Sequence, residues 1–457
     1  MHSGSTETTH AAHHRSAVVA RPAGNETHSA THAAPPDGVT TDRVAADAAR
    51  TTTRSPARHP RVAILDGLRL VAALMVVSYH YIARGDAWTA ASPHGFPHVI
   101  YVAARFGFFG VELFFLISGF VICMSGMGRS LGQFFVARVV RLYPAYWFAV
   151  LATAVVVTLW PTINRPLAHT DVVTNLTMLQ IPLHTPSVDG VYWTLWVELR
   201  FYLLFALVVF FGVTYRRVVA FCALWTVASV ATIAVGGPLL DNGQSSTLLQ
   251  LAIVPQYSPY FIAGMAFFLM HRFRPDPLLW GIVGIQLMLA IHHLRVDPMI
   301  MHKFSGTAAS VEPIVVVFFF AVMALVALHK LTVGWRWLTV AGTLTYPLYL
   351  LHQHIGWILI DKLQHEVPAP VVVVAVVAFM LIAAWLVHRL IERPLAARMR
   401  RLLVPAIGRL RPPRAPMVRL PVQLAPRPRP PMAPPGNAGA ESRAGSATTQ
   451  RATWSDA

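Results

Sequence analysis

Arg69 and His80 are two ionisable residues in the first apolar segment of the chain, LDGLRLVAALMVVSYHY. They are eleven residues apart, and at 100° per residue this spacing lies about 20° from a whole number of helical turns. On one helix both side chains would share a face, about 16 Å apart along the axis at 1.5 Å per residue. Ionisable residues within membrane spans usually face a bundle interior or a wet cavity. The pair therefore predicts an anion-binding group at one depth and a proton-transfer group at another.

Glu112 stands near the start of the second apolar segment, in GVELFFLISGF. If the first two segments are antiparallel neighbours, Glu112 and His80 lie at similar depth. A carboxylate beside an imidazole fixes the tautomer of the ring and favours its protonated form, which suits general-base catalysis. A pair that only locks two helices together is the structural alternative. We predict that His80 and Glu112 are catalytic.

Arg138 and Arg141 are three residues apart in FFVARVVRLYPAYW and would share one face of a helix. Two arginines at the mouth of a bundle, with Arg69 deeper, are suited to binding phosphate groups. The preference of basic residues for the cytoplasmic membrane edge explains the same pattern without a ligand. The sequence offers no convincing set of metal ligands, and we expect no metal.

Five further residues are candidates for binding a substrate: Trp193 and Glu198 in VYWTLWVELRFY, and Tyr346, Tyr349 and His352 in TYPLYLLHQ. The last three are spaced by three residues and would line one helical stripe. Carboxylates and aromatic rings suit the hydroxyl groups and faces of sugars. Helix capping, anchoring at the membrane interface and hydrogen bonding between helices are the structural alternatives.

The composition is that of a membrane protein. Of 457 residues, 55% are hydrophobic and only 12% are charged, with a mean hydropathy of +0.52. A soluble domain carries about twice that charged fraction. We predict an all-α, polytopic bundle of about ten transmembrane helices. The predicted spans are 68–84, 107–125, 142–160, 199–215, 218–236, 248–270, 278–294, 313–329, 338–359 and 370–390.

Loop charge sets the predicted orientation. The loops on one side of the predicted spans carry nine Lys and Arg residues against six on the other, and Arg-rich flanks adjoin both ends of the membrane region. The positive-inside rule then places both termini in the cytoplasm of a plasma (inner) membrane protein. The net charge of +17 is explained by this topology and by the tails, so we expect no nucleic-acid partner.

Three regions follow from the pattern along the chain. Residues 1–60 and 397–457 lack apolar periodicity and are predicted to be disordered tails. Residues 61–396 form the predicted membrane domain. No cleavable signal peptide is expected, because about sixty polar residues precede the first span. The long loop at about 161–197 is predicted to be a lid or a binding loop.

Together these motifs resemble the acyltransferase-3 family of integral-membrane acyltransferases, which O-acylate sugars, macrolides and cell-surface glycans. The resemblance covers about residues 61–396. It is carried by DGLR followed by the Arg69-to-His80 spacing, and by GVELFFLISGF, RVVRLYPAYW, WTLWVELRFY, TYPLYLLHQ and IERP. Six motifs in order are a specific signal, whereas any one of them alone is weak.

The resemblance implies an acyl-CoA co-substrate, commonly acetyl-CoA, that is used from the cytoplasmic side, with no permanently bound cofactor. It implies His80 as the catalytic residue, with Arg69, Arg138 and Arg141 near the CoA. Glu112 and Glu198 match acidic family positions. A hydroxyl of a sugar, surface glycan or glycosylated metabolite is the expected acceptor, reached by direct transfer because no fused hydrolase-like domain is present. A transporter or proton-coupled exporter is the main alternative, since transport pathways also contain buried charges.

Overall fold

The structure is a computed structural model that describes residues 63–88, 95–161, 167–236, 253–296, 311–331 and 335–407. The described residues form helices, turns and loops and contain no strand, which confirms the all-α prediction. In chain order the elements are α2 (Ala63–Ser78), η1 (Tyr79–Ala83), α3 (His98–Arg105), η3 (Phe106–Phe109), α4 (Gly110–Gly126), α5 (Leu131–Leu159), α6 (His169–Asn175), η4 (Gly190–Tyr192), α7 (Trp193–Phe211), α8 (Tyr215–Gly236), α10 (Ser258–Arg272), α11 (Pro277–Val296), α13 (Glu312–Ala327), α14 (Arg336–Leu363), α15 (Ala369–Val387), η6 (His388–Glu392) and α16 (Arg393–Ile407).

Seven helical stretches among the described residues are long and apolar enough to cross a membrane. They contain α2, α4, α5, α7, α8, α11 and α15. The protein is therefore a polytopic helical membrane protein, while the count of about ten spans stays a prediction. Of the other predicted spans, α10 and α13 have only 15 and 16 residues. α14 is 28 residues long but carries many polar side chains.

α4 and α10 pack closely against each other. A Cβ atom at Gly119 of α4 would overlap the carbonyl oxygen of Phe261, and one at Gly264 of α10 would overlap that of Leu116. Small residues of this kind let helix backbones approach each other within a membrane. α10 is buried along nearly its whole length. On another side, α4 packs against α2.

α5 begins with a capping box. The Ser130 hydroxyl accepts from the Gln133 N–H at 3.3 Å, and the Gln133 side chain accepts from the Ser130 N–H at 3.1 Å. Starting at Leu131, the helix runs through Pro144 to Leu159. Arg138 and Arg141 therefore lie on one continuous helix, which begins well before the predicted span at 142–160.

Two π-helical turns interrupt helices that carry sequence motifs. Tyr79–Ala83 follows α2 directly and contains His80, and His388–Glu392 joins α15 to α16. Such turns are rare and often occur at functional sites. Because a π turn holds more residues than an α turn, side chains beyond it no longer keep α-helical spacing from the residues before it.

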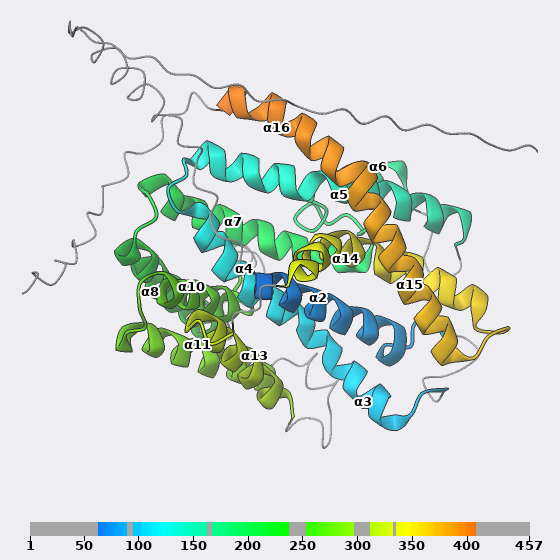
Figure 1. Cartoon of the computed structure of the whole chain (residues 1–457), viewed down its shortest axis with the longest axis horizontal. Coiled ribbons are helices and arrows are strands. Elements are labelled where there is room, and N and C mark those ends of the chain that lie inside the picture. Colours follow the sequence, from blue (N-terminus) through cyan, green and yellow to red (C-terminus); the bar gives the residue numbers. More distant parts are fainter. Residues whose placement is uncertain are drawn as a thin grey trace, which may run out of the picture. The chain divides into compact units, whose positions relative to one another are not determined.

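α16 continues the chain beyond the IERP motif and lies alongside α5 (Figure 1). We predicted a last span at 370–390 and a disordered tail that starts at residue 397. The structure is instead helical from Arg393 to Ile407. Pro394 falls in the first turn of α16, where its missing N–H costs no helical hydrogen bond. The predicted N-terminal tail and residues 408–457 lie outside the described residues.

Candidate active site

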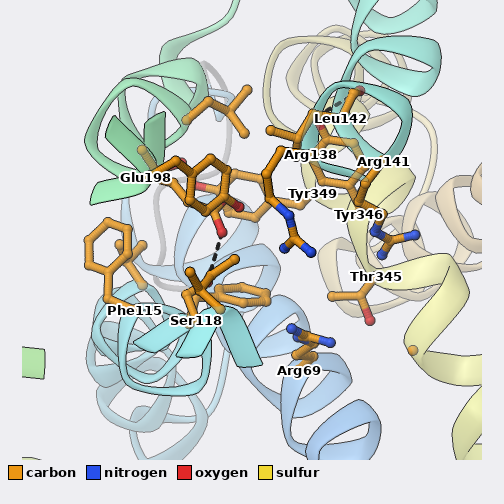
Figure 2. A pocket seen from close by; sticks show the side chains of 17 residues that line it. Arg69, Phe115, Ser118, Arg138, Arg141, Leu142, Glu198, Thr345, Tyr346 and Tyr349 are labelled. Carbon is orange, nitrogen blue, oxygen red and sulfur yellow. Dashed lines mark hydrogen bonds between the residues drawn. The ribbon is translucent and has the colours of Figure 1, made fainter. Parts of the chain in front are cut away.

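Three arginines converge between α2 and α5. The guanidinium groups of Arg69, Arg138 and Arg141 point toward the same space (Figure 2). The structure contains two cavities here, and both are lined by these three arginines and by Gly342 of α14. The two cavities therefore adjoin each other at the arginines.

The first of these spaces, here called the arginine cavity, has a volume of about 470 Å³. Arg129 from the α4–α5 connection and Arg400 from α16 also line it, as do the carboxylates of Asp66 and Glu392. Five arginines against two carboxylates leave an excess of three positive charges at the wall. Guanidinium groups bind phosphate groups through paired hydrogen bonds, so the cavity is suited to a phosphorylated ligand.

Each shared arginine is held by a neighbour. Arg69 lies 3.4 Å from the Asp66 carboxylate, and Arg138 donates to the Ser125 hydroxyl at 3.1 Å. Arg141 forms an ion pair with Glu392 at 2.8 Å, which ties α5 to the start of α16. No carboxylate among the described residues forms an ion pair with Arg138. Its charge is thus available to a ligand.

The inner cavity, of about 120 Å³, continues from the arginines between α4, α7 and α14. Its walls are mostly apolar, with a few convergent polar groups. The Ser118 hydroxyl donates to Glu198 at 2.8 Å, as Figure 2 shows, and Thr194 and Tyr349 share a hydrogen bond of 2.8 Å. The Tyr346 ring lies beside these groups. A narrow, mixed lining of this kind is typical of a pocket for part of a small molecule.

His80 and His352 form a buried imidazole pair, and the Tyr349 ring contacts the His352 ring. The Tyr349 carbonyl oxygen can only accept, and it lies 2.8 Å from Nδ1 of His352, so that nitrogen carries the proton. Nε2 of neutral His352 is then an acceptor, and Nδ1 of His80, 3.0 Å away, must donate to it. The free lone pair of neutral His80 is therefore on Nε2, which is the form that a general base requires.

The π-helical turn secures the position of His80. In an α-helix the Arg84 N–H would bond the His80 carbonyl, but here it bonds the Tyr79 carbonyl at 2.9 Å. The His80 carbonyl instead accepts from the indole N–H of Trp357 at 3.1 Å. The hydroxyl of Tyr81, the next residue in the same turn, donates to the His352 carbonyl at 2.7 Å. These bonds clamp the end of α2 to α14.

The predicted partner of His80 differs from the observed one. We predicted Glu112, but the Nδ1 position of His80 is taken by His352. Glu112 is buried in the first turn of α4 and interacts electrostatically with Tyr260 and Tyr349.

The structure separates the other candidates into two groups. Arg69, Arg138, Arg141, Glu198, Tyr346 and Tyr349 all line the inner cavity. His80 and His352 do not line either cavity, although the Tyr349 ring contacts that of His352, with centroids 5.6 Å apart. The Trp193 ring packs on Tyr257 at 5.4 Å, outside both linings.

Ser118, Arg129 and Arg400 line the cavities but were not among our predicted site residues. Ser118 lies within an apolar run and Arg400 lies in a stretch that we predicted to be disordered. The segment RPLAARMRRLL combines apolar residues at helical spacing with several arginines. This amphipathic pattern could have predicted a helix that contains Arg400.

Glu392→Gln is expected to lower the free energy of unfolding by about 1 kcal/mol, because it breaks a charge-assisted bond whose arginine is partly exposed. Thermal unfolding of the purified protein in detergent measures the loss. Asp86→Asn is the matched control, since it breaks the exposed Arg84–Asp86 pair and should change the melting temperature little. Equal shifts for both variants would contradict a structural role for Glu392.

Comparison with known proteins shows the family of this chain. The family model Acyl_transf_3, described as an acyltransferase domain, matches residues 62–389. Over 119 residues the chain is 32% identical to the "Putative peptidoglycan O-acetyltransferase YrhL" of Bacillus subtilis (strain 168). That match covers 24% of this chain and only 16% of the length of that protein. No solved structure gives a significant match.

Proposed function

Because the chain belongs to the acyltransferase-3 family, we propose that it transfers an acyl group, with acetyl as the expected case, from acyl-CoA to a hydroxyl of a sugar or glycan. The observation that carries this proposal is the pair of adjoining cavities. An arginine-lined space continues into a smaller pocket that is lined in part by Tyr349, whose ring contacts His352, the hydrogen-bond partner of His80.

The charge of the cavities and the spacing between Arg69 and His80 both suit the donor. The phosphate groups of CoA would lie among Arg69, Arg138 and Arg141, with Arg129 and Arg400 at the far wall of the arginine cavity. The pantetheine arm is on the order of 15–20 Å long by simple bond geometry. This length is comparable to the rise of about 16 Å between Arg69 and His80. Ser118, Glu198 and Thr194 would offer hydrogen bonds to the amides of the arm.

His80 would act as the general base. Its Nε2 takes the proton of the acceptor hydroxyl as that oxygen attacks the thioester carbonyl. The C–S bond then breaks, and the CoA thiolate receives the proton from the imidazolium. His352 holds the ring in the required tautomer and is a positioning residue in this scheme, instead of the substrate-binding residue that we predicted. Tyr349 separates the inner cavity from the imidazole pair, so its side chain must turn aside for the thioester to reach His80.

The acceptor is supported by the Bacillus subtilis relative, whose name gives peptidoglycan as its substrate. Glu198, Tyr346 and Tyr349 line the same inner cavity as the arginines, so we now assign them to the donor. The acceptor would approach from the opposite end of α2, where Arg84 lies 5.2 Å from the centre of the Trp357 ring. We further propose an inner-membrane location with both termini in the cytoplasm, which places the arginine cavity on the side where acyl-CoA is present.

Release of CoA tests the proposal directly. The protein, purified and reconstituted in lipid nanodiscs, is given acetyl-CoA together with peptidoglycan fragments or other glycans. We expect free thiol to appear only when an acceptor is present, and mass spectrometry to detect an acetyl ester on the acceptor. A transporter would move its solute across proteoliposomes without consuming acetyl-CoA. Absence of thiol release with every glycan class would refute the acyltransferase proposal.

Arg69→Met is expected to raise the KM for acetyl-CoA about 10–100-fold with a smaller change in kcat, because it removes charge-assisted hydrogen bonds to phosphate. Arg69→Lys keeps the charge but loses the planar fork, so an intermediate KM is expected. Arg216→Met removes an exposed arginine on α8 and serves as the matched control. Steady-state kinetics over a range of acetyl-CoA concentrations separate the two constants. A KM equal to that of Arg216→Met would remove Arg69 from the donor site.

A further inference from the structure

Asp189 is a fully buried carboxylate in the loop that precedes η4. Its Oδ1 accepts from the Val191 N–H at 3.1 Å, and its Oδ2 accepts from the main-chain N–H of His354 in α14, also at 3.1 Å. No ion pair joins Asp189 to a cation among the described residues. Burial of an unpaired carboxylate costs free energy, so its place inside the protein calls for a reason beyond the two hydrogen bonds.

The loop around Asp189 is fixed against the turn of α14 that carries the histidines. The Val188 carbonyl accepts from Nδ1 of His354 at 2.9 Å. Asn175, at the end of α6, holds the other side of the loop by bonding the Val188 N–H and the Pro186 carbonyl. A Cβ atom at Gly190 would lie 2.7 Å from the Gln353 side chain, so the loop touches α14 directly. Asp189 therefore has a defined position relative to His352.

The electrostatic neighbours of Asp189 include one half of the imidazole pair. The carboxylate interacts with His352 and with the hydroxyl groups of Tyr81, Tyr192 and Tyr349. The other charged or titratable groups that act on the pair are Arg84, next to the π-helical turn, and His354. Arg84 is a cation, so it opposes further positive charge at His80, although its own ion pair with Asp86 offsets part of this effect. Asp189 is the carboxylate that acts on His352.

We propose that Asp189 is a positioning residue and the counter-ion of the His80–His352 pair; this inference rests on the proposed function. When His80 takes the proton from the acceptor hydroxyl, the buried pair gains one positive charge. Attraction between charges several ångströms apart is stronger inside a protein than in water. A fixed carboxylate beside His352 stabilises that charge in the transition state without moving. The long loop at about 161–197, which we predicted to be a lid or a binding loop, thus supplies the carboxylate next to the imidazole pair. We had predicted that role for Glu112.

Nuclear magnetic resonance tests this role without relying on catalysis. The protein is labelled with ¹⁵N-histidine in nanodiscs, and the signals of the pair are identified by their loss in His80→Ala and His352→Gln. In Asp189→Asn we expect these signals to titrate about one pH unit lower than in the wild type, because the charged form loses its partner. Asp189→Ser also removes the charge and keeps an acceptor oxygen, and it is measured in parallel in case the Asn variant does not fold. Asp171→Asn removes a carboxylate that caps α6 on the same loop and should leave the titration unchanged.

The kinetic arm uses the same variants. We expect kcat of Asp189→Asn to fall about 10²-fold with the KM for acetyl-CoA unchanged, and the ascending limb of its pH–rate profile to move to lower pH. Folded Asp189 variants that titrate like the wild type overturn the inference, even if their rate is reduced. A different result is that the titration shifts in Asp189→Asn as expected while the wild-type protein releases no CoA with any acceptor. That result would refute the proposed function and leave the role of Asp189 as a counter-ion intact.

Discussion

His80→Ala is expected to lower kcat for acyl transfer by about 10²–10⁴-fold, the range that a positioned general base contributes. The reason is geometric. His352 receives the Nδ1 proton of His80, so the Nε2 lone pair is free to take the proton of an acceptor hydroxyl. Alanine leaves no group in this position that could accept it. The rate is measured as acceptor-dependent thiol release by purified protein at saturating acetyl-CoA.

His365→Ala is the matched control for this variant. His365 is exposed after the end of α14 and should keep the wild-type rate. Both variants should insert into the membrane and elute as the wild type does in detergent, because the bonds from Trp357 to the His80 carbonyl and from Tyr81 to the His352 carbonyl do not need the His80 ring. A well-folded His80→Ala protein with a normal rate would exclude His80 from the mechanism.

His352→Leu is expected to lower kcat about 10–100-fold, with little change in the KM for acetyl-CoA, since it acts only by positioning another group. Without an acceptor at 3.0 Å, the neutral His80 ring can carry its proton on either nitrogen and loses its fixed orientation. Leu fills the space of the ring but accepts no hydrogen bond.

His352→Gln provides the comparison that separates positioning from packing. The glutamine amide oxygen can accept from Nδ1 of His80, so this variant should recover part of the rate. Equal rates for the Leu and Gln variants would show that the hydrogen bond to His352 does not position His80. A changed KM with unchanged kcat would instead return His352 to the substrate-binding role that we first predicted.

Several predictions about helices are confirmed because they depend on local spacing. Arg138 and Arg141, three residues apart, do share a helical face and line the same two cavities. Tyr346 and Tyr349 share a face of α14 for the same reason. The periodicity of an α-helix sets the relative directions of such neighbours whatever the helix packs against.

Predictions about partners across the bundle were less successful. His80 meets His352, 272 positions away in the chain, instead of Glu112. Glu392 pairs with Arg141, 251 positions away, a contact that the sequence did not indicate. A change from α- to π-helical turns, which apolar periodicity does not reveal, occurs at both sites.

The amino-acid sequence by itself determined the class of this protein, its family and the faces on which Arg69, Arg138, Arg141 and the tyrosines of α14 lie. Hydropathy and helical periodicity are properties of short segments, and the backbone must satisfy its hydrogen bonds within each span. Only the tertiary structure decided that two imidazoles form the pair, that Tyr349 separates them from the inner cavity, and that Asp189 lies buried beside them. Those contacts join segments far apart in the chain, and their geometry depends on how closely helices such as α4 and α10 can pack and where a π turn redirects a side chain.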